Sequence, residues 1–136
     1  MTAAASYLLD TTVLVDISRE REPAATWSRA LLRSAHVVDV STVSVAEFFA
    51  GLRPEARSTW ETFFGDLERW EVTTAVAIRA GSLRYDFARK GRTILIPDAI
   101  IAATAIAVGA VLVTSNVKHF PFPDLVLMEP GAHVPA

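Results

Sequence analysis

The longest apolar stretch of the chain is TILIPDAIIAATAIAVGAVLVTSNV, 25 residues from Thr93 to Val117 with Asp98 as the single ionisable side chain. A segment that is apolar on every face predicts deep burial. Pro97, Asp98 and Gly109 divide it into pieces shorter than the ~18–20 apolar residues that a membrane helix needs. We therefore predict strand, helix and strand in succession, with the helix over Asp98–Val108 ended by Gly109.

Apolar runs alternate with amphipathic segments along the rest of the chain. Strands are predicted at Ser6–Leu9, His36–Val40, Glu71–Thr73, Ala110–Thr114 and Asp124–Met128. Helices are predicted after a threonine cap at Thr11 or Thr12, and over Glu20–Arg33, Val45–Leu52, Glu55–Trp70 and Ala75–Lys90. This alternation predicts a single α/β domain over residues 1–136, a three-layer α/β/α fold with a mostly parallel, four- to five-stranded sheet.

Composition limits the classes of function. With 136 residues, half of them apolar and none of them cysteine, the chain predicts a globular domain without disulfides or thiolate metal sites. The N-terminus lacks the pattern of a signal peptide, so a cytoplasmic location is expected. A net charge of −2 argues against a generally basic nucleic-acid binder, although 11 of the 13 cations are arginines. A polyanionic substrate is permitted and not indicated.

Three acids are isolated among apolar residues at places where ligands bind in parallel sheets. Asp10 follows the first strand, Glu47 lies on the helix after the second, and Asp98 begins the apolar helix. Asn116 follows the strand after that helix. The carboxyl ends of neighbouring parallel strands face one crevice, so these side chains are expected to meet. Helix capping for Asp10 and Asp98, and solvent exposure for Glu47, stay open as alternatives. Asp39 is expected at a strand end or facing outward.

Carboxylates gathered without histidine or thiol partners favour a hard cation. Mg²⁺ or Mn²⁺ is therefore the metal that the pattern predicts. The histidines, His36, His119 and His133, are poorly placed to serve as nucleophiles.

Four segments in this order resemble the PIN-domain ribonucleases, and among them the VapC toxins of bacterial toxin–antitoxin pairs. The segments are LLDTTVLVD, STVSVAEFFAGL, IPDAIIAATA and LVTSNVKHF, spread over Leu8 to Phe120. The resemblance implies that Asp10, Glu47 and Asp98 bind the metal and that Thr12 supports the site. It gives Asn116 the fourth position, which is Asp in some members. The preceding residue is often Arg in that family and is Ser115 here, so an extra cation is expected to be missing.

The resemblance implies a Mg²⁺-dependent endoribonuclease, with Mn²⁺ as a possible substitute, that acts as the toxin of such a pair. Metal-activated water would cut RNA to leave 5′-phosphate and 3′-hydroxyl ends. It also implies a homodimer and a VapB-type antitoxin partner, without membrane contact. Two alternatives remain: a catalytically inactive PIN-like binding module, and a phosphoacceptor receiver domain.

The amphipathic helix and the one before it carry a dense set of aromatic side chains. These are Phe48, Phe49, Trp60, Phe63 and Phe64. Such a stripe is usually core, but here it exceeds what one helical hairpin is expected to bury. An antitoxin segment is the expected occupant of the remaining surface.

Overall fold

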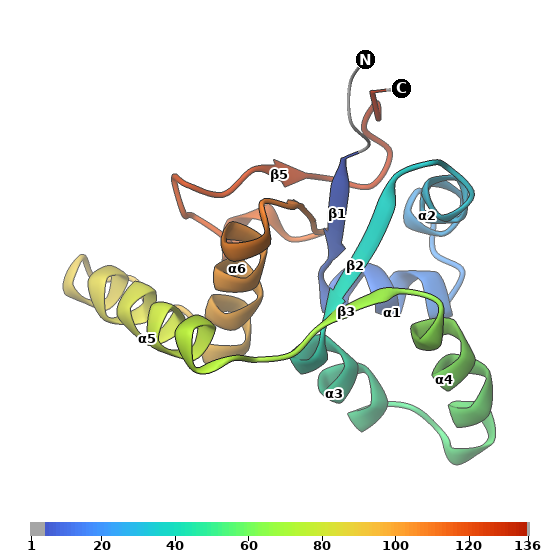
Figure 1. Cartoon of the computed structure of the whole chain (residues 1–136), viewed down its shortest axis with the longest axis horizontal. Helices are drawn as coiled ribbons and strands as arrows, with labels where there is room; N and C mark the ends of the chain where they lie inside the picture. The colour runs from blue at the N-terminus through green and yellow to red at the C-terminus, as the bar shows by residue number, and fades with distance from the viewer. Residues whose placement is uncertain (1–4, 136) are drawn as a thin grey trace.

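One parallel sheet organises the computed structural model, which describes residues 5–135 (Figure 1). Its strand order is β3–β2–β1–β4–β5, and all four strand pairs are parallel. The strands are β1 (Ser6–Leu9), β2 (Val37–Ser41), β3 (Glu68–Trp70), β4 (Val111–Val113) and β5 (Leu127–Met128). The α-helices are α1 (Thr11–Ser18), α2 (Ala24–Leu32), α3 (Thr42–Ala50), α4 (Arg57–Gly65), α5 (Thr74–Arg89) and α6 (Ile96–Val108). Two short 3₁₀ turns are η1 (Pro54–Ala56) and η2 (Val117–His119). The predicted fold class is confirmed.

Alternation of side chains along β1 builds a core on each face of the sheet. Leu8 packs with residues of α5 and α6, whereas Tyr7 and Leu9 pack with residues of α1 to α4. Figure 1 shows α5 and α6 on one side of the sheet and α1 to α4 grouped on the other. Because both faces are covered, β4 and the part of β1 after Ser6 are buried and largely apolar, as expected of parallel strands.

The apolar stretch forms a helix and a strand, but the strand predicted at its start is absent. The residues before Ile96 form the connection from α5, and Ile94 is buried there without pairing to the sheet. Pro97 lies in the first turn of α6, and Gly109 ends the helix at φ 70°. That left-handed conformation suits glycine, as predicted. No helix within residues 5–135 has the length and apolar character to cross a membrane.

The predicted helix over Glu55–Trp70 was too long. It begins as η1, continues as α4 and ends at Gly65, and residues 68–70 form β3. The third strand therefore precedes its predicted place at 71–73. Leu67 is buried where the chain turns back, whereas all three residues of β3 are exposed. The strand is polar because it lies at the sheet edge, and polar residues do not distinguish an edge strand from the outer face of a helix.

Asp39 lies inside the sheet, which contradicts its predicted place at a strand end or facing outward. It is 1% exposed and pairs in register with Leu8 and Glu68. The Ser6 hydroxyl donates a hydrogen bond to Oδ2, and Oδ1 has no hydrogen-bond partner among the described residues. Ser6, on the neighbouring strand β1, supplies the polar contact to Asp39 that the sequence pattern did not reveal.

Candidate active site

Asp10 lies where the strand order of the sheet reverses. It directly follows β1, between β2 and β4, which is the position where parallel α/β sheets open a crevice for ligands. Asp10 itself, and not a threonine, is the N-cap of α1, with extended backbone angles of φ −71° and ψ 157°. Its backbone N–H donates to Val113 O at 2.9 Å, which fixes the cap to β4.

Three donors hold the Asp10 carboxylate, which is 3% exposed. Thr11 N donates to Oδ1 at 2.7 Å. Thr12 Oγ1 and Thr114 Oγ1 each donate to Oδ2 at 2.8 Å. These bonds satisfy a buried charge and leave a lone pair on Oδ1 for a further partner.

Glu47 and Asp98 come from two other elements and line the same hollow as Asp10. Glu47 lies on α3, which Ser41 caps, and its Oε1 accepts a hydrogen bond from Thr11 Oγ1 at 2.7 Å. Asp98 is in the first turn of α6. The hollow has a volume of about 360 Å³ and is also lined by Thr12, Val15, Asp16, Arg21, Leu95 and His119. The structure therefore brings the three predicted acids to one place.

Burial, together with the neighbouring carboxylates, raises the pKa of Asp98 to about 6, from an ordinary value of 3.8. Burial is the largest cause, because it removes water from the charged form. The negative charges of Asp10 and Glu47 raise the pKa further, and His119 opposes them. Because these negative charges repel one another, they favour the binding of either a proton or a cation at Asp98.

We expect the metal-free protein to lose stability as the pH rises from about 4 to about 6. The folded state holds the Asp98 proton in this window and the unfolded state has released it, so unfolding releases a proton. Above this pH window the loss in the free energy of unfolding is constant and amounts to at most roughly 3 kcal/mol. Urea unfolding in EDTA at several pH values measures it for wild type and Asp98→Asn. Parallel pH profiles for the two proteins would contradict the assignment.

Asn116 and Thr12 lie beside the acids in different ways. Thr12 donates to Asp10 Oδ2 and accepts a hydrogen bond from Ser115 N at 3.3 Å. The amide nitrogen of Asn116 lies 3.0 Å from Nε2 and 3.2 Å from Nδ1 of His119, and its backbone N–H donates to Thr114 Oγ1 at 3.0 Å. Asn116 therefore reaches the hollow through His119.

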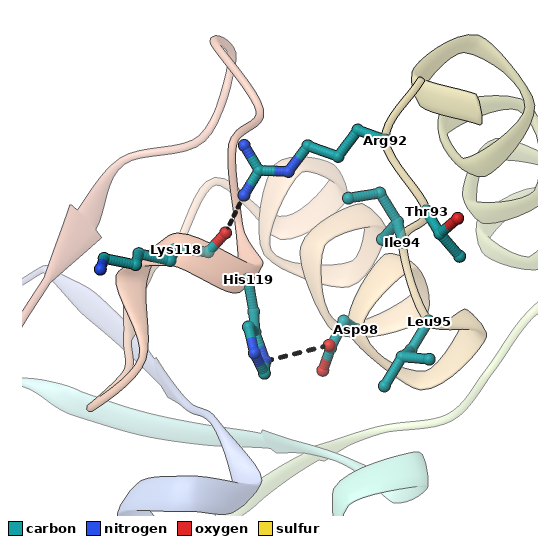
Figure 2. Close-up of a pocket in the computed structure, with 7 residues that line it drawn as sticks. All are labelled: Arg92, Thr93, Ile94, Leu95, Asp98, Lys118 and His119. Atoms are coloured by element: carbon teal, nitrogen blue, oxygen red, sulfur yellow. Dashed lines mark hydrogen bonds and ion pairs between the residues drawn. The ribbon is translucent and has the colours of Figure 1, made fainter. Parts of the chain in front are cut away.

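His119 lies in the site, which contradicts its description as poorly placed. Its Nδ1 is 3.5 Å from Asp98 Oδ2, and Figure 2 shows the two side chains facing each other. A second, smaller hollow of about 110 Å³ shares Leu95, Asp98 and His119 with the first. Arg92 also lines it and donates a hydrogen bond to the carbonyl of Lys118. The turn η2 brings His119 there, and no periodic pattern in the sequence indicates such a turn.

Asp16 and Arg21 also line the larger hollow and were not predicted as site residues. Arg21 Nη1 is 3.5 Å from Asp16 Oδ1, and Ser115 Oγ donates to Asp16 Oδ2 at 2.9 Å. The resemblance implied that the site lacks an extra cation because residue 115 is serine. The cation of that position is indeed absent, and Arg21 brings one from a different segment.

The donor chemistry of the site fits a hard divalent cation. Asp10, Glu47 and Asp98 offer carboxylate oxygens only, and burial and the charges of the other two acids both raise the pKa of Asp98. Within residues 5–135, however, no group of three acidic or histidine side chains is arranged to hold an ion directly. Glu47 is hydrogen-bonded to Thr11, and Asp98 faces His119. The residues present therefore fit the ion chemically, and their side chains would have to rotate towards it.

Known proteins share both the sequence and the fold of this chain. The model of the PIN domain matches residues 7–121. The ribonuclease VapC19 of Mycobacterium tuberculosis is 38% identical over 119 residues, which cover 87% of this chain and 95% of that protein. The solved complex VapBC2 of Rickettsia felis, bound to a DNA fragment from its promoter, contains a chain with a TM-score of 0.77 and 27% identity. The match covers 91% of this chain and 98% of that one.

A second solved complex, DNA-bound VapBC from Salmonella typhimurium, aligns with a TM-score of 0.76 and 28% identity. That match covers 92% of this chain and 98% of the other. The family match spans all three acids of the hollow and excludes the receiver-domain alternative. The chain belongs to the PIN-domain family, in its branch of VapC ribonucleases.

Proposed function

We propose that this protein is a Mg²⁺-dependent endoribonuclease and the toxin of a toxin–antitoxin pair. The observation that carries the proposal is the meeting of Asp10, Glu47 and Asp98 in one hollow at the strand-order reversal. These three carboxylates would hold the ion, and Mn²⁺ would substitute for it because its ligand preferences are similar. When bound, the ion supplies the positive charge that activates water and offsets charge on the phosphate.

The side chains around the acids prepare the site. Thr12 and Thr114 fix the orientation of the Asp10 carboxylate before substrate arrives, and this preorganisation lowers the cost of reaching the transition state. Asn116 contacts the His119 ring, which in turn faces Asp98, so Asn116 supports the site through that histidine.

The RNA substrate would place its scissile phosphate over the three acids. Water attacks phosphorus, the bond to the 3′ oxygen breaks, and that oxygen takes up a proton. The products are therefore a 3′-hydroxyl end and a 5′-phosphate end. Arg92 and Lys118, which line the smaller hollow beside Asp98, supply positive charge near the phosphate backbone.

A VapB-type antitoxin is the proposed partner, as in the VapBC complexes of the related structures. The aromatic cluster between α3 and α4 supports this. Phe48 and Phe64 are buried, whereas Phe49, Trp60 and Phe63 are only partly buried. The apolar surface that remains suits an antitoxin segment.

A homodimer is also proposed. Helix α5 packs chiefly against α6, and its side chains Ile78 and Tyr85 are 66% and 61% exposed. Two large apolar side chains on one helix favour contact with a second copy.

Cleavage of RNA by the EDTA-treated protein tests the proposal. We expect no products in EDTA, cleavage after Mg²⁺ or Mn²⁺ is added, and 5′-phosphate and 3′-hydroxyl ends by mass spectrometry. The reason is that carboxylates alone cannot neutralise the phosphate. Cleavage of equal rate in EDTA would contradict metal dependence. No cleavage under any metal would favour the inactive binding module.

A further inference from the structure

We propose that Arg21 binds a backbone phosphate of the RNA beside the scissile phosphate. The inference rests on the proposed function and assigns a substrate-binding role to a residue outside the acids. Arg21 lies in the connection between α1 and α2 and lines the larger hollow together with Asp10, Glu47 and Asp98.

The charge balance of the hollow requires a cation that faces the substrate. Four carboxylates line it, those of Asp10, Asp16, Glu47 and Asp98, and a metal ion bound by the other three would leave Arg21 as the cation beside Asp16. Among the described residues that line this hollow, Arg21 has the one permanent positive charge. An RNA strand approaching the acids is repelled unless such a charge contacts its phosphates.

The backbone of Arg21 is fixed on both sides. Its N–H donates to Asp16 O at 2.9 Å, which anchors it to the end of α1. Its carbonyl accepts a hydrogen bond from Ala25 N at 2.9 Å, which anchors it to the start of α2. The guanidinium therefore leaves the chain from a defined point at the edge of the hollow.

The guanidinium is directed towards the site and remains available to a ligand. Asp16 Oδ1 lies 3.5 Å from Nη1, longer than the about 2.7–2.9 Å of a charge-assisted hydrogen bond. The Arg21 side chain is 57% exposed, so a ligand can reach it. Asp16 is in turn held by Ser115, whose N–H donates to Thr12, a hydrogen-bond donor to Asp10.

This series of contacts links the Arg21 position to the carboxylate at the centre of the site. A guanidinium fork matches two oxygens of a phosphate, and each phosphate contact of this type positions the strand without reading its sequence. The role of Arg21 is thus to set the register of the RNA backbone over the acids.

Binding of a fluorescent single-stranded RNA of mixed sequence, measured in EDTA at several salt concentrations, tests the inference. Arg21→Gln should raise the Kd by about 10–100-fold, because it removes a hydrogen-bonded charge. The slope of log Kd against log salt should fall by about 0.7, which corresponds to one lost phosphate contact on a single strand. Arg21→Lys should keep the slope, because it keeps the charge.

Arg29→Gln is the matched control. Arg29 is 48% exposed and forms a similar surface ion pair with Glu20 at 3.7 Å, but it lies outside the residues that line the hollow. Both arginine side chains are exposed, at 57% and 48%, so neither substitution should change the melting temperature appreciably. In Mg²⁺, Arg21→Gln should raise KM for RNA cleavage more than it lowers kcat, and Arg29→Gln should change neither.

The outcomes separate this inference from the proposed function. If wild type and Arg21→Gln bind RNA with equal Kd and equal salt slope, Arg21 does not contact the substrate, although the ribonuclease proposal stands. A change in Kd that Arg29→Gln reproduces would likewise overturn the inference. A wild type that neither binds nor cuts RNA would remove the proposed function and the inference together.

Discussion

Asp98→Asn should reduce RNA cleavage by roughly 10³-fold or more, because a bound metal ion supplies several kcal/mol of transition-state stabilisation. The protein should stay folded and become more stable at neutral pH without metal. Burial and the charges of Asp10 and Glu47 disfavour the ionised Asp98 carboxyl, and asparagine removes that ionisation. Cleavage rates in Mg²⁺ and urea unfolding in EDTA measure the two effects.

Asp124→Asn is the control for this substitution. Asp124 is 73% exposed and forms a surface pair with Arg79 at 3.7 Å. It is an aspartate outside the site, so its variant should cut RNA at the wild-type rate and gain no comparable stability. Near wild-type cleavage by Asp98→Asn would show that Asp98 is not a metal ligand.

Asp10→Ala should abolish cleavage and also destabilise the fold by about 2–4 kcal/mol. The substitution removes the N-cap of α1, which contributes ~1 kcal/mol. It also leaves the fully buried Thr114 hydroxyl without its acceptor, at a cost of about 1–3 kcal/mol. Chemical unfolding of wild type and Asp10→Ala in EDTA measures the loss of stability without any contribution from metal binding.

Glu47→Ala separates the loss of cleavage from the loss of stability that are expected together for Asp10→Ala. Glu47 is exposed and accepts one hydrogen bond, from Thr11, so its removal should abolish cleavage at little cost in stability. If Asp10→Ala were no less stable than Glu47→Ala, the hydrogen bonds at Asp10 would not support the fold as described.

The sequence could predict the most apolar elements. α6 and β4 come from one apolar stretch. In any fold Pro97 favours the first turn of a helix and Gly109 favours its end. The meeting of Asp10, Glu47 and Asp98 follows from parallel topology, because Asp10 follows strand β1, Glu47 lies on the helix that follows β2, and Asp98 lies in the first turn of α6. Tertiary contacts did not have to be known for either prediction.

The remaining features depend on contacts between distant segments. β3 is an exposed edge strand whose polar residues continue the pattern of α4. The periodic pattern therefore predicted that the helix ends later than it does. Asp39 is tolerated inside the sheet because Ser6, on the neighbouring strand, donates to it. His119 and Arg21 enter the site from a 3₁₀ turn and a helix connection, and the conformations of such segments are not periodic.

Calorimetric titration of the EDTA-treated, dialysed protein with Mn²⁺ tests most directly whether Asp10, Glu47 and Asp98 together hold a metal ion. The wild type should bind Mn²⁺, and Mg²⁺ should compete for the same site. Asp98→Asn and Glu47→Ala should each weaken Mn²⁺ binding by at least about tenfold. Even residues that only hydrogen-bond to metal ligands change the metal affinity by about 10–100-fold, so the loss of a ligand should reach at least the lower value. Asp124→Asn should bind as the wild type does. Equal Mn²⁺ affinity in wild type, Asp98→Asn and Glu47→Ala would contradict a metal site at these carboxylates.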